Sequence, residues 1–576
     1  MKNQTLAKIF REIAEYLEMD GVPFKPQAYE KAAMALETMK EDAGDLYEKG
    51  GIKALKSIPG VGEAIAKKME EYLITGRLGY YEKFKEKIPI DLDELTRVEG
   101  LGPRRAKILF EKAGVRNLED LEKAARDGRI APLSGFGEKT EKNILEAIAF
   151  LKRSKGRFLL GDILHVAESI LEKLRGVKGV ERADMAGSLR RMQETIGDVD
   201  FLVASRDPDR VMEVFLSLPG VEKIWGKGKT KSSVRMKEGF DMDVRVVEPA
   251  IYGAALQYFT GSKAHNIALR KIAIDRGFKL SEYGLFEGAK RLVAGTEEEI
   301  YRRLGLQWIP PEMREDRGEI ALAGEGKLPE LISLEDIRGD LHVHSDWDGG
   351  ASPIGEIAES AMKRGYRYVG IADHTRFLKI ERGLDEDKIR ERNVEIDRIN
   401  RALKKSGRRF VVLKGCEANI MNDGSVDIED EVLAELDFVI AGIHSNFRMT
   451  RSQMTERITR AMRNPHVDIL SHPTGRILKR RDEYEIDFEE ILRAARQTGT
   501  ILEINAYPER LDLGDVNILR AKEAGVRMVI NTDAHHADRL DMMKFGVAQA
   551  RRGWAEKKDV VNAGSIEAFL RSMKSP

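Results

Sequence analysis

The sequence predicts a multidomain α+β protein in which helices come first, a mixed α/β region follows and a βα barrel ends the chain. Three observations predict this order. Over about the first 155 residues, apolar residues recur at spacings of three and four, the period of a helix packed on a core. From about residue 158 to 315, strand-like and helical patterns are mixed. From residue 339 on, short apolar strands such as YVGIAD and FVIAGIHS alternate with helical runs, which is typical of a βα barrel.

Composition excludes several classes of protein. The chain has 576 residues, 42% of them hydrophobic, so it can fill several cores and is neither disordered nor fibrous. Its length predicts about three to five domains. A single cysteine excludes a disulfide scaffold and cysteine-based zinc fingers. No apolar run approaches the ~18 residues that span a bilayer, and the first residues lack a signal-peptide core, so we expect a cytoplasmic protein.

A short motif occurs three times in the helical region. Residues 58–62, 98–102 and 133–137 each read apolar-x-Gly-apolar-Gly, and each precedes a helical run. The glycines allow a tight turn and leave backbone N–H groups free at the start of the second helix, where anions bind. This is the helix-hairpin-helix signature, which holds DNA phosphates without reading base sequence. The predicted DNA-binding residues are Gly60, Gly62, Gly100, Gly102, Arg104, Gly135 and Gly137.

Local charge supports DNA binding by this region, although the whole chain has 97 Lys and Arg against 97 Asp and Glu. Residues 97–157 contain 15 Lys and Arg against 9 Asp and Glu, a local net charge of +6. A basic surface favours nucleic acid as a partner. The alternative is three ordinary helix–turn–helix packings that bind nothing.

Paired acids mark the mixed region. In GDVDFLV, Asp198 and Asp200 alternate with apolar residues, so on a strand both carboxylates share one face. In FDMDVRVV, Asp241 and Asp243 repeat the pattern, so a third carboxylate can lie on an adjacent strand. Three carboxylates on adjacent strands can hold two Mg²⁺ ions for phosphoryl transfer. The alternative is a solvated edge strand.

The segments GSLRR, GDVDF, DMDVRVV and YFTGS together resemble the nucleotidyltransferase palm of family X DNA polymerases, relatives of DNA polymerase beta. The resemblance implies that Asp198, Asp200 and Asp243 are catalytic and bind two Mg²⁺ or Mn²⁺ ions. Between the second and third acids, residues 225–237 hold five basic residues and no acid, which favours a basic edge facing DNA over a solvated hairpin. The residues implied to bind the incoming deoxynucleoside triphosphate are Gly187, Ser188, Arg191, Gly197, Tyr258, Phe259, Gly261, Lys263 and Asn266.

About the first 85 residues resemble the small lyase-type domain of the same family. Lys68 lies where that family has its Schiff-base lysine, whereas Ala64 stands where the family has a neighbouring lysine. Two interpretations of Lys68 therefore stay open. One is 5′-deoxyribose phosphate lyase chemistry, and the other is a lysine that contacts phosphate or solvent.

Histidines are concentrated near the end of the chain. Eight of the ten lie after residue 340, most of them at the ends of predicted strands. In HxH and DxH both side chains lie on one face of a strand, and strand ends meet at one rim of a barrel. Imidazole mixed with carboxylate suits Zn²⁺, Mn²⁺ or Fe²⁺ better than Mg²⁺, and such ions can assist phosphoester hydrolysis. The alternative is a group of structural histidines without a metal.

This pattern resembles a PHP (polymerase and histidinol phosphatase) domain, a distorted seven-stranded barrel that holds three metals. Asp348 is taken as the last ligand although it comes one position early, with Asp346 and Asp373 as substitutes. His344 and Glu417 are expected to be catalytic. Cys416 is expected to be a packed small residue. The ligands of Mn²⁺ or Zn²⁺ implied by the resemblance are His342, His344, Asp348, His374, Glu417, His444, His472, Asp533 and His535, while His466 and His536 match no motif position.

The predicted domains follow from these resemblances, which cover essentially the whole chain. They are a lyase-like domain with a helix-hairpin-helix (1–88), a domain with two more such elements (89–157), a palm (158–248), a thumb (249–315), a linker (316–338) and a (β/α)7 PHP barrel (339–576).

The resemblance implies a DNA repair enzyme with two active sites. One would fill short gaps in gapped or nicked DNA with deoxynucleotides. The other would trim ends as a 3′-5′ exonuclease, with abasic-site endonuclease and 3′-phosphatase as further activities. One chain carries every part, so we expect a monomer, with a repair ligase as a partner. The alternatives are a PHP phosphatase, for DNA or a small molecule, with a vestigial polymerase, and a non-catalytic DNA-binding scaffold.

Overall fold

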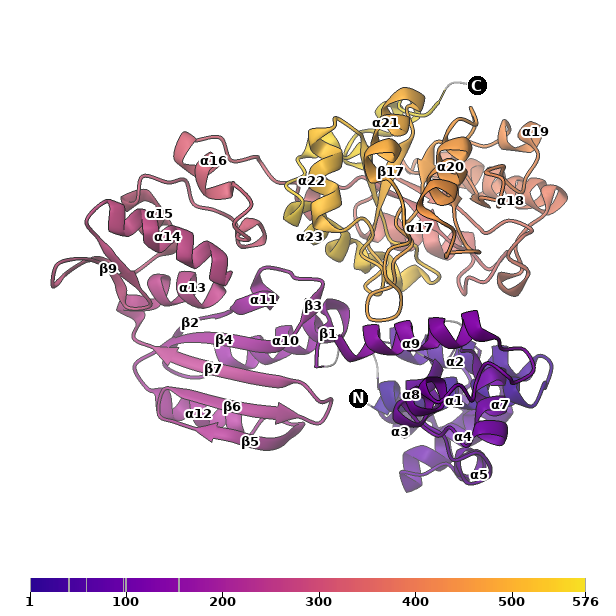
Figure 1. Ribbon diagram of the computed structural model, residues 1–576, viewed down its shortest axis with the longest axis horizontal. Coiled ribbons are helices and arrows are strands. Elements are labelled where there is room, and N and C mark those ends of the chain that lie inside the picture. The colour runs from indigo at the N-terminus through magenta and orange to yellow at the C-terminus, as the bar shows by residue number, and fades with distance from the viewer. Residues whose placement is uncertain are drawn as a thin grey trace. The chain divides into compact units, whose positions relative to one another are not determined.

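The computed structural model describes residues 2–39, 42–58, 60–96, 98, 101–153 and 156–574 (Figure 1). The chain forms two compact units. One consists of Met1–Lys155 with Lys479–Asp482, and the other of Gly156–Leu478 with Glu483–Pro576. Among the described residues, no helix is both long enough and apolar enough to cross a membrane.

The first unit is helical, as its apolar spacing predicts. The apolar positions form one core that includes Leu6 in the first helix and Ile148 in the last. Two of the helices, α4 and α7, end at glycines in the left-handed conformation, Gly76 and Gly114, each with a φ of 71°. The helices are α1 (Lys2–Met19), α2 (Lys25–Thr38), α3 (Ala43–Leu55), α4 (Glu63–Thr75), α5 (Gly79–Lys87), α6 (Leu92–Thr96), α7 (Pro103–Ala113), α8 (Leu118–Arg126) and α9 (Glu138–Arg153).

The three glycine motifs form the same turn, so the predicted repeat is confirmed. In each one, an amide donates to the carbonyl three residues earlier over 3.0 Å. These donor–acceptor pairs are Val61–Ile58, Leu101–Val98 and Phe136–Leu133. A side chain added at Gly62, Gly102 or Gly137 would meet nothing within 4 Å, so the starts of α4, α7 and α9 are open. Gly100 lies outside the described residues.

The second unit begins with a five-stranded sheet in the order β2-β4-β7-β6-β5, in which β4 and β7 run parallel and the other pairs are antiparallel. Helices α10 and α12 pack on one face over a core that includes Val199, Phe201 and Met242. The opposite face is packed by α13 at Leu202 and Ala204, beyond the acids. The elements are β1 (Phe158–Leu159), α10 (Leu160–Arg175), β2 (Val180–Met185), α11 (Gly187–Arg190), β3 (Thr195–Ile196), β4 (Asp198–Ser205), α12 (Pro208–Leu216), β5 (Val221–Lys227), β6 (Lys231–Met236) and β7 (Asp241–Val247).

A helical region with a small antiparallel sheet, β10-β9-β8, follows the palm. Its fully buried Arg314 pairs with Glu297 over 2.6 Å, and Glu297 also pairs with Arg190 of α11 over 2.7 Å. These ion pairs tie the region to the palm. The elements are α13 (Tyr252–Thr260), α14 (Lys263–Asp275), β8 (Lys279–Ser281), β9 (Gly284–Glu287), β10 (Lys290–Val293) and α15 (Glu297–Arg303), with α16 (Glu319–Glu325) in the segment that was expected to be a linker.

The last region is a closed barrel of parallel strands. Its two sheets, β11-β12-β13 and β14-β15-β16-β17-β18, are joined by bridges from His374 to Glu417 and from Val343 to Ala534. Because β13 and β14 are consecutive parts of one broken strand, the barrel has seven strands, as predicted. The strands are β11 (Gly339–Val343), β12 (Tyr368–Ile371), β13 (Val411–Lys414), β14 (Glu417–Asn419), β15 (Ile440–Gly442), β16 (Ile469–Leu470), β17 (Ile501–Asn505) and β18 (Met528–Asn531).

Helices surround the barrel strands (Figure 1). Every one of these strands except β13 is buried along its whole length, which explains why their sequences are continuous apolar runs. The helices are α17 (Ile354–Lys363), α18 (Glu386–Lys405), α19 (Asp430–Leu433), α20 (Arg451–Met462), α21 (Phe488–Thr498), α22 (Asp515–Glu523), α23 (Met543–Arg552) and α24 (Ile566–Leu570).

Candidate active sites

Three carboxylates meet on the face of the palm sheet opposite α10 and α12, beyond the part that α13 covers. In the parallel pair β4–β7, Asp198 lies opposite Asp241 and Asp200 lies opposite Asp243. Neighbouring strands are about 4.8 Å apart, so these acids form a compact group. Burial, together with the charges of Asp198 and Asp243, raises the pKa of Asp200 to about 7. This crowding of like charges fits a site that is completed by divalent cations.

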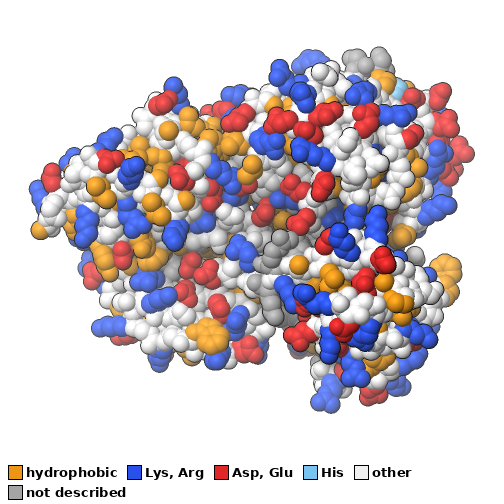
Figure 2. Space-filling view, in the orientation of Figure 1, with side chains coloured by type: hydrophobic (Ala, Val, Ile, Leu, Met, Phe, Trp, Pro, Cys, Tyr) orange, Lys and Arg blue, Asp and Glu red, His pale blue; other side chains and the backbone are white. Residues whose placement is uncertain are grey.

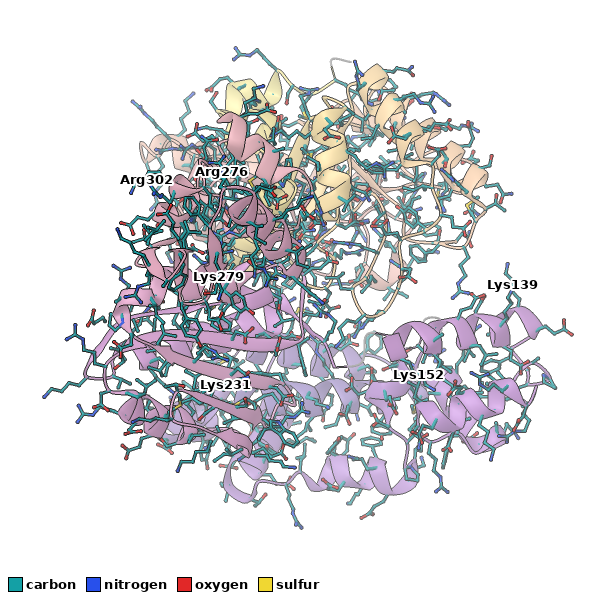
Figure 3. All side chains as sticks on the ribbon, turned by 60° about the vertical axis from the view of Figure 1, so that its left-hand side comes forward. Lys139, Lys152, Lys231, Arg276, Lys279 and Arg302 are labelled. Carbon is teal, nitrogen blue, oxygen red and sulfur yellow. The ribbon has the colours of Figure 1, made fainter. Side chains whose placement is uncertain are left out.

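The neighbours of these acids separate Asp241 from Asp243. Asp241 accepts a hydrogen bond from Nε1 of Trp225 over 2.8 Å and pairs with Arg235 over 3.1 Å. Asp243 instead faces the ammonium of Lys231 at 2.7 Å, at the edge of a small cavity that Asp200 also lines. Figure 3 labels Lys231 on the palm sheet. The carboxylate of Asp241 is thus already bound by side chains of β5 and β6, which favours Asp243 as the third metal-binding acid.

The GSLRR segment folds against the acids. Gly187 has a φ of 57°, and a Cβ there would lie 2.3 Å from a carboxylate oxygen of Asp200, so only glycine fits. Ser188 follows it in α11, and Gly197 directly precedes β4. The guanidinium of Arg191 is fixed by Glu315 at 3.0 Å and by the carbonyl of Thr260 at 2.5 Å.

The YFTGS segment ends α13 next to this loop. A Cβ at Gly261 would lie 3.2 Å from the guanidinium of Arg191, so the two predicted nucleotide-binding segments meet. Phe259 lines the same cavity as Asp200 and Asp243. The side-chain amide of Asn266 donates to the backbone carbonyl of Tyr258 over 2.7 Å and accepts from the side-chain amide of Gln257 over 2.7 Å. Lys263 is exposed at the start of α14.

The first unit carries two predicted features. Arg104 is exposed in the first turn of α7, and Figure 3 labels Lys139 and Lys152 on α9. The ammonium of Lys68, on α4, lies 4.6 Å from the centre of the Tyr80 ring. Partial burial lowers the pKa of Lys68, although the charge of Glu71 opposes this.

The predicted histidines and acids of the barrel meet at the carboxyl ends of its strands. Their atoms form overlapping groups, each within 4.8 Å, that could hold metal ions. The rings of His344 and His535 stack with centroids 4.1 Å apart. The groups are His344, His374 and His535; His342, His344 and Asp533; His374, Glu417 and His444; and His344, Asp348 and Asp373.

Glu417 lies at the centre of this cluster and is 1% exposed. Its oxygens lie 2.8 Å from His374, 3.0 Å from His472, 3.2 Å from His444 and 3.3 Å from His342. Although carboxylate oxygens lie near most of them, several buried imidazole nitrogens among the described side chains have no partner with the geometry of a hydrogen bond; they are Nε2 of His342, His344 and His444 and Nδ1 of His374 and His472. Buried nitrogens are rarely left unbonded, so this donor set fits divalent metals.

Asp533 and Asp348 flank His344 on opposite sides. Asp533 lies 3.4 Å from its Nε2, whereas Oδ2 of Asp348 lies 2.8 Å from its Nδ1. Asp348 also accepts from the amides of His374 and Gly350. Asp533 has a φ of 55°, a sparsely populated conformation of the kind that functional sites retain.

The other candidates of this region have structural partners. Asp373 is fully buried against Arg392 at 3.1 Å and also accepts from Ser345. His536 caps the turn that follows it by accepting from the amide of Asp538. Cys416 is fully buried, as expected, and burial raises the pKa of its thiol to about 12.

Sequence reasoning missed Glu503. Its Oε1 lies 2.7 Å from Nδ1 of His342, and its other oxygen accepts from the amide of His472 over 2.8 Å. Both contacts orient metal-binding candidates. The available signal was a charged residue inside the apolar strand ILEIN, since a fully buried carboxylate requires strong partners.

Comparisons with known proteins match several parts of the chain. Four family models match the chain: a helix-hairpin-helix domain at residues 1–78, a SAM-like helix-hairpin-helix tandem at 92–149, the DNA polymerase beta thumb at 255–315 and a PHP domain at 340–507. The fold and the two sites therefore define a family X DNA polymerase architecture that ends in a PHP domain.

The relatives narrow this assignment. The DNA polymerase/3'-5' exonuclease PolX of Bacillus subtilis is 39% identical over 579 residues, which covers 99% of this chain and 100% of that protein. The chain belongs to the PolX family of family X DNA polymerases. A probable phosphatase of Thermoanaerobacter sp. (strain X514) is 28% identical over 251 residues, covering 41% of this chain and 95% of that protein. A probable phosphatase of Caldanaerobacter subterraneus is 32% identical over 208 residues, covering 34% and 75%.

Proposed function

We propose that this chain is a DNA polymerase that fills short gaps and, at a second site, a 3′-5′ exonuclease. The observation that carries the proposal is that one chain contains an acid triad, a histidine–carboxylate cluster in a separate domain, and repeated helix-hairpin-helix turns. The Bacillus subtilis relative is named for both activities. Gapped DNA and deoxynucleoside triphosphates are the substrates we assign.

At the palm, Asp198, Asp200 and Asp243 would hold two Mg²⁺ or Mn²⁺ ions. Bound there, such ions acidify the attacking hydroxyl and neutralise the leaving pyrophosphate. The primer's 3′-oxygen attacks the α-phosphorus, and the bond from that phosphorus to the bridging oxygen breaks. Gly187 and Ser188 present the start of α11 to the triphosphate. Because Gly187 has no side chain, this start can lie close to Asp200.

The remaining residues that we assign to nucleotide binding lie near the loop at Gly187, or directly before β4, in the palm and the adjoining α13 and α14. Arg191 is held by Glu315 and Thr260, so its charge is fixed next to Gly261 at the mouth of the loop. We assign Tyr258, Phe259 and Gly261 to the sugar of the incoming nucleotide. Lys263, Asn266 and Gly197 complete the nucleotide-binding set. We also propose that the chain is divided into domains at the boundaries that the sequence predicts.

At the barrel, the histidine–carboxylate cluster would hold up to three Mn²⁺ or Zn²⁺ ions, with Asp348 included among its ligands. Bound there, these ions polarise the scissile phosphate and acidify the attacking water. Water adds to the phosphorus of the last phosphodiester, the bond from that phosphorus to the 3′-oxygen of the preceding nucleotide breaks, and the terminal nucleotide is released as a 5′-monophosphate. The buried imidazole nitrogens without hydrogen bonds support this assignment. Abasic-site endonuclease and 3′-phosphatase reactions need the same chemistry.

The helix-hairpin-helix turns would hold the DNA. Their helices α4, α7 and α9 begin with free amides at open glycine positions, which suits backbone phosphates. This assigns DNA contacts to Gly60, Gly62, Gly100, Gly102, Arg104, Gly135 and Gly137. We propose that the chain acts as a monomer and hands its product to a ligase.

A second candidate activity rests on Lys68. Its lowered pKa favours the neutral amine, which can condense with the aldehyde of a 5′-deoxyribose phosphate and lose water to form an imine. Borohydride would reduce that imine and fix the chain to DNA. We expect such trapping in the wild type and none in Lys68→Ala; equal trapping by both would reject the assignment.

The test of the main proposal uses a duplex with a one-nucleotide gap, labelled on the upstream primer. It is incubated with Mn²⁺, with and without deoxynucleotides. We expect extension by the wild type and by His344→Ala, but not by Asp198→Ala/Asp200→Ala. We expect shortening by the wild type and by the Asp double variant, but not by His344→Ala.

The rival functions give different results in the same experiment. A small-molecule phosphatase would not shorten the primer, and a vestigial polymerase would not extend it. A non-catalytic scaffold would do neither while still binding DNA. Any of these outcomes for the wild type would reject the corresponding half of the proposal.

A further inference from the structure

One aromatic side chain of the palm is exposed and has no role in either site. Trp225 lies on β5, the edge strand of the sheet, and is 51% exposed. Six of the seven residues of β5 are exposed, so this strand contributes little to the palm core. In Figure 2, hydrophobic and basic side chains lie next to each other over the palm. An exposed tryptophan among cations is the composition of a nucleic-acid contact.

The indole lies on the face of the sheet that carries the acids. Its Nε1 donates to Asp241 over 2.8 Å, and Asp241 lies opposite Asp198 and two residues before Asp243. One such step along a strand is about 7 Å, so the ring lies within one nucleotide of the acid group. The preceding residue, Ile224, pairs with the buried Val234 and therefore belongs to the opposite face.

The sheet order then tells which strand of DNA the ring would meet. The acids lie on β4 and β7, at the middle of the order β2-β4-β7-β6-β5. The nucleotide loop at Gly187 follows β2 and packs on Asp200 of β4. A triphosphate bound at that loop would lie on the β2 side of the acids, which leaves the β6–β5 side, over the indole, for the strand that delivers the 3′-hydroxyl.

The surroundings of the ring suit a polynucleotide. Lys223 lies 4.1 Å from the ring centre and Arg235 lies 5.8 Å from it. Lys223 is exposed, so its ammonium can leave the ring for a phosphate. The bonds of Asp241 to both Trp225 and Arg235 hold the indole in place before DNA arrives, which reduces the entropy lost on binding.

We propose that Trp225 is a stacking platform for the last two nucleotides of the primer strand, with Lys223 neutralising one of their phosphates. The inference rests on the proposed polymerase function, since that function supplies the primer. It assigns a positioning role: the ring does not touch the reacting atoms but holds the strand that carries the 3′-hydroxyl.

The test places 2-aminopurine, whose fluorescence is quenched by stacking, in a gapped duplex without deoxynucleotides or metal. The probe stands at the penultimate primer position or in the template opposite the gap. With the wild type we expect quenching of the primer probe that Trp225→Ala loses and Trp225→Phe largely keeps. Equal quenching by wild type and Trp225→Ala, or a loss confined to the template probe, would overturn the proposal.

A kinetic arm separates this inference from the proposed function. Trp225→Ala should raise the KM for gapped DNA at least about fivefold, while leaving the KM for deoxynucleotide unchanged. Ile224→Ala, on the opposite face, is the matched control and should leave both constants unchanged. If Trp225→Phe behaves as Trp225→Ala in both arms, the indole N–H rather than stacking matters, and the platform is rejected. Failure of the wild type to extend the primer would reject the polymerase, while the fluorescence arm still decides on the platform.

Discussion

The imidazole of His342 is held by Glu503 through a 2.7 Å contact between Nδ1 and Oε1, and both side chains are fully buried. A carboxylate at Nδ1 places the proton on that nitrogen. The lone pair of Nε2, on the side of Glu417 and Asp533, is then available to bind a metal. Glu503 also accepts from Asn531, so it is itself fixed. The carboxylate thus orients a metal-binding candidate without needing to bind the metal.

Replacing this carboxylate should weaken the barrel site alone. We expect Glu503→Gln to lower the affinity for Mn²⁺ by about 10- to 100-fold and to reduce primer shortening, with extension unchanged. Metal content after dialysis and the gapped-duplex assay measure the two effects. Glu523→Gln, the same change at an exposed position, is the control. Wild-type metal content in Glu503→Gln would show that His342 does not depend on this contact.

Short sequence motifs predicted the turns between helices and the side chains at the ends of strands. The repeated glycines predicted three matching turns, and the motifs HxH and DxH placed His342, His344 and Asp533 at one rim. Glu503 was missed because a single acid within an apolar strand has no motif. The contact of Lys231 with Asp243 was also unpredictable, since it depends on the register between β6 and β7. The register between β6 and β7 is therefore what the sequence did not reveal, although it did predict that the acids lie on adjacent strands.

The packing of Gly187 predicts a defect confined to the polymerase. A methyl group there would lie 2.3 Å from Oδ2 of Asp200, and the φ of 57° disfavours any side chain. Displacement of α11 or of the carboxylate by about 1 Å costs on the order of 100-fold in rate. We expect Gly187→Ala to lose about that factor in kcat/KM for extension and to keep the exonuclease.

A second glycine of the palm controls for this change. A Cβ added at Gly226 on β5 would have no atom within 4 Å, so Gly226→Ala should extend primers at the wild-type rate. Steady-state extension of the gapped duplex compares the two variants. Equal rates for Gly187→Ala and the wild type would mean that the loop is not close to Asp200 during the reaction.

The fully buried pair of Arg392 and Asp373 predicts a large effect on stability. Arg392 also donates to the carbonyl of Gly415 over 2.6 Å. Arg392→Met would leave the carboxylate buried without its cation, which costs about 3–5 kcal/mol. We expect a lower unfolding temperature, measured by calorimetry, and partial recovery in Arg392→Met/Asp373→Asn. Arg390→Met removes an exposed pair with Glu435 and should change nothing measurable; an equal effect of both variants would contradict the argument.

Glu15, in the first unit, predicts that stability depends on pH. Burial, with the charges of Glu12 and Asp93, raises the pKa of Glu15 to about 7 from its ordinary value of 4.5. A carboxyl group whose pKa is raised by folding stabilises the folded state while it is protonated. That contribution is complete below about pH 4.5 and is lost as the pH rises through 7, up to about 3 kcal/mol in all.

Glu15→Gln removes this titration because an amide stays neutral. We therefore expect the variant to gain stability over the wild type between pH 5 and 8, with the difference largest at pH 8. Scanning calorimetry of the full chain at several pH values in this range measures it. Glu18→Gln, at an exposed position of α1, serves as the control and should follow the wild type. A difference between Glu15→Gln and the wild type that is the same at pH 5 and pH 8 would show that Glu15 is ionised in the folded chain throughout this range.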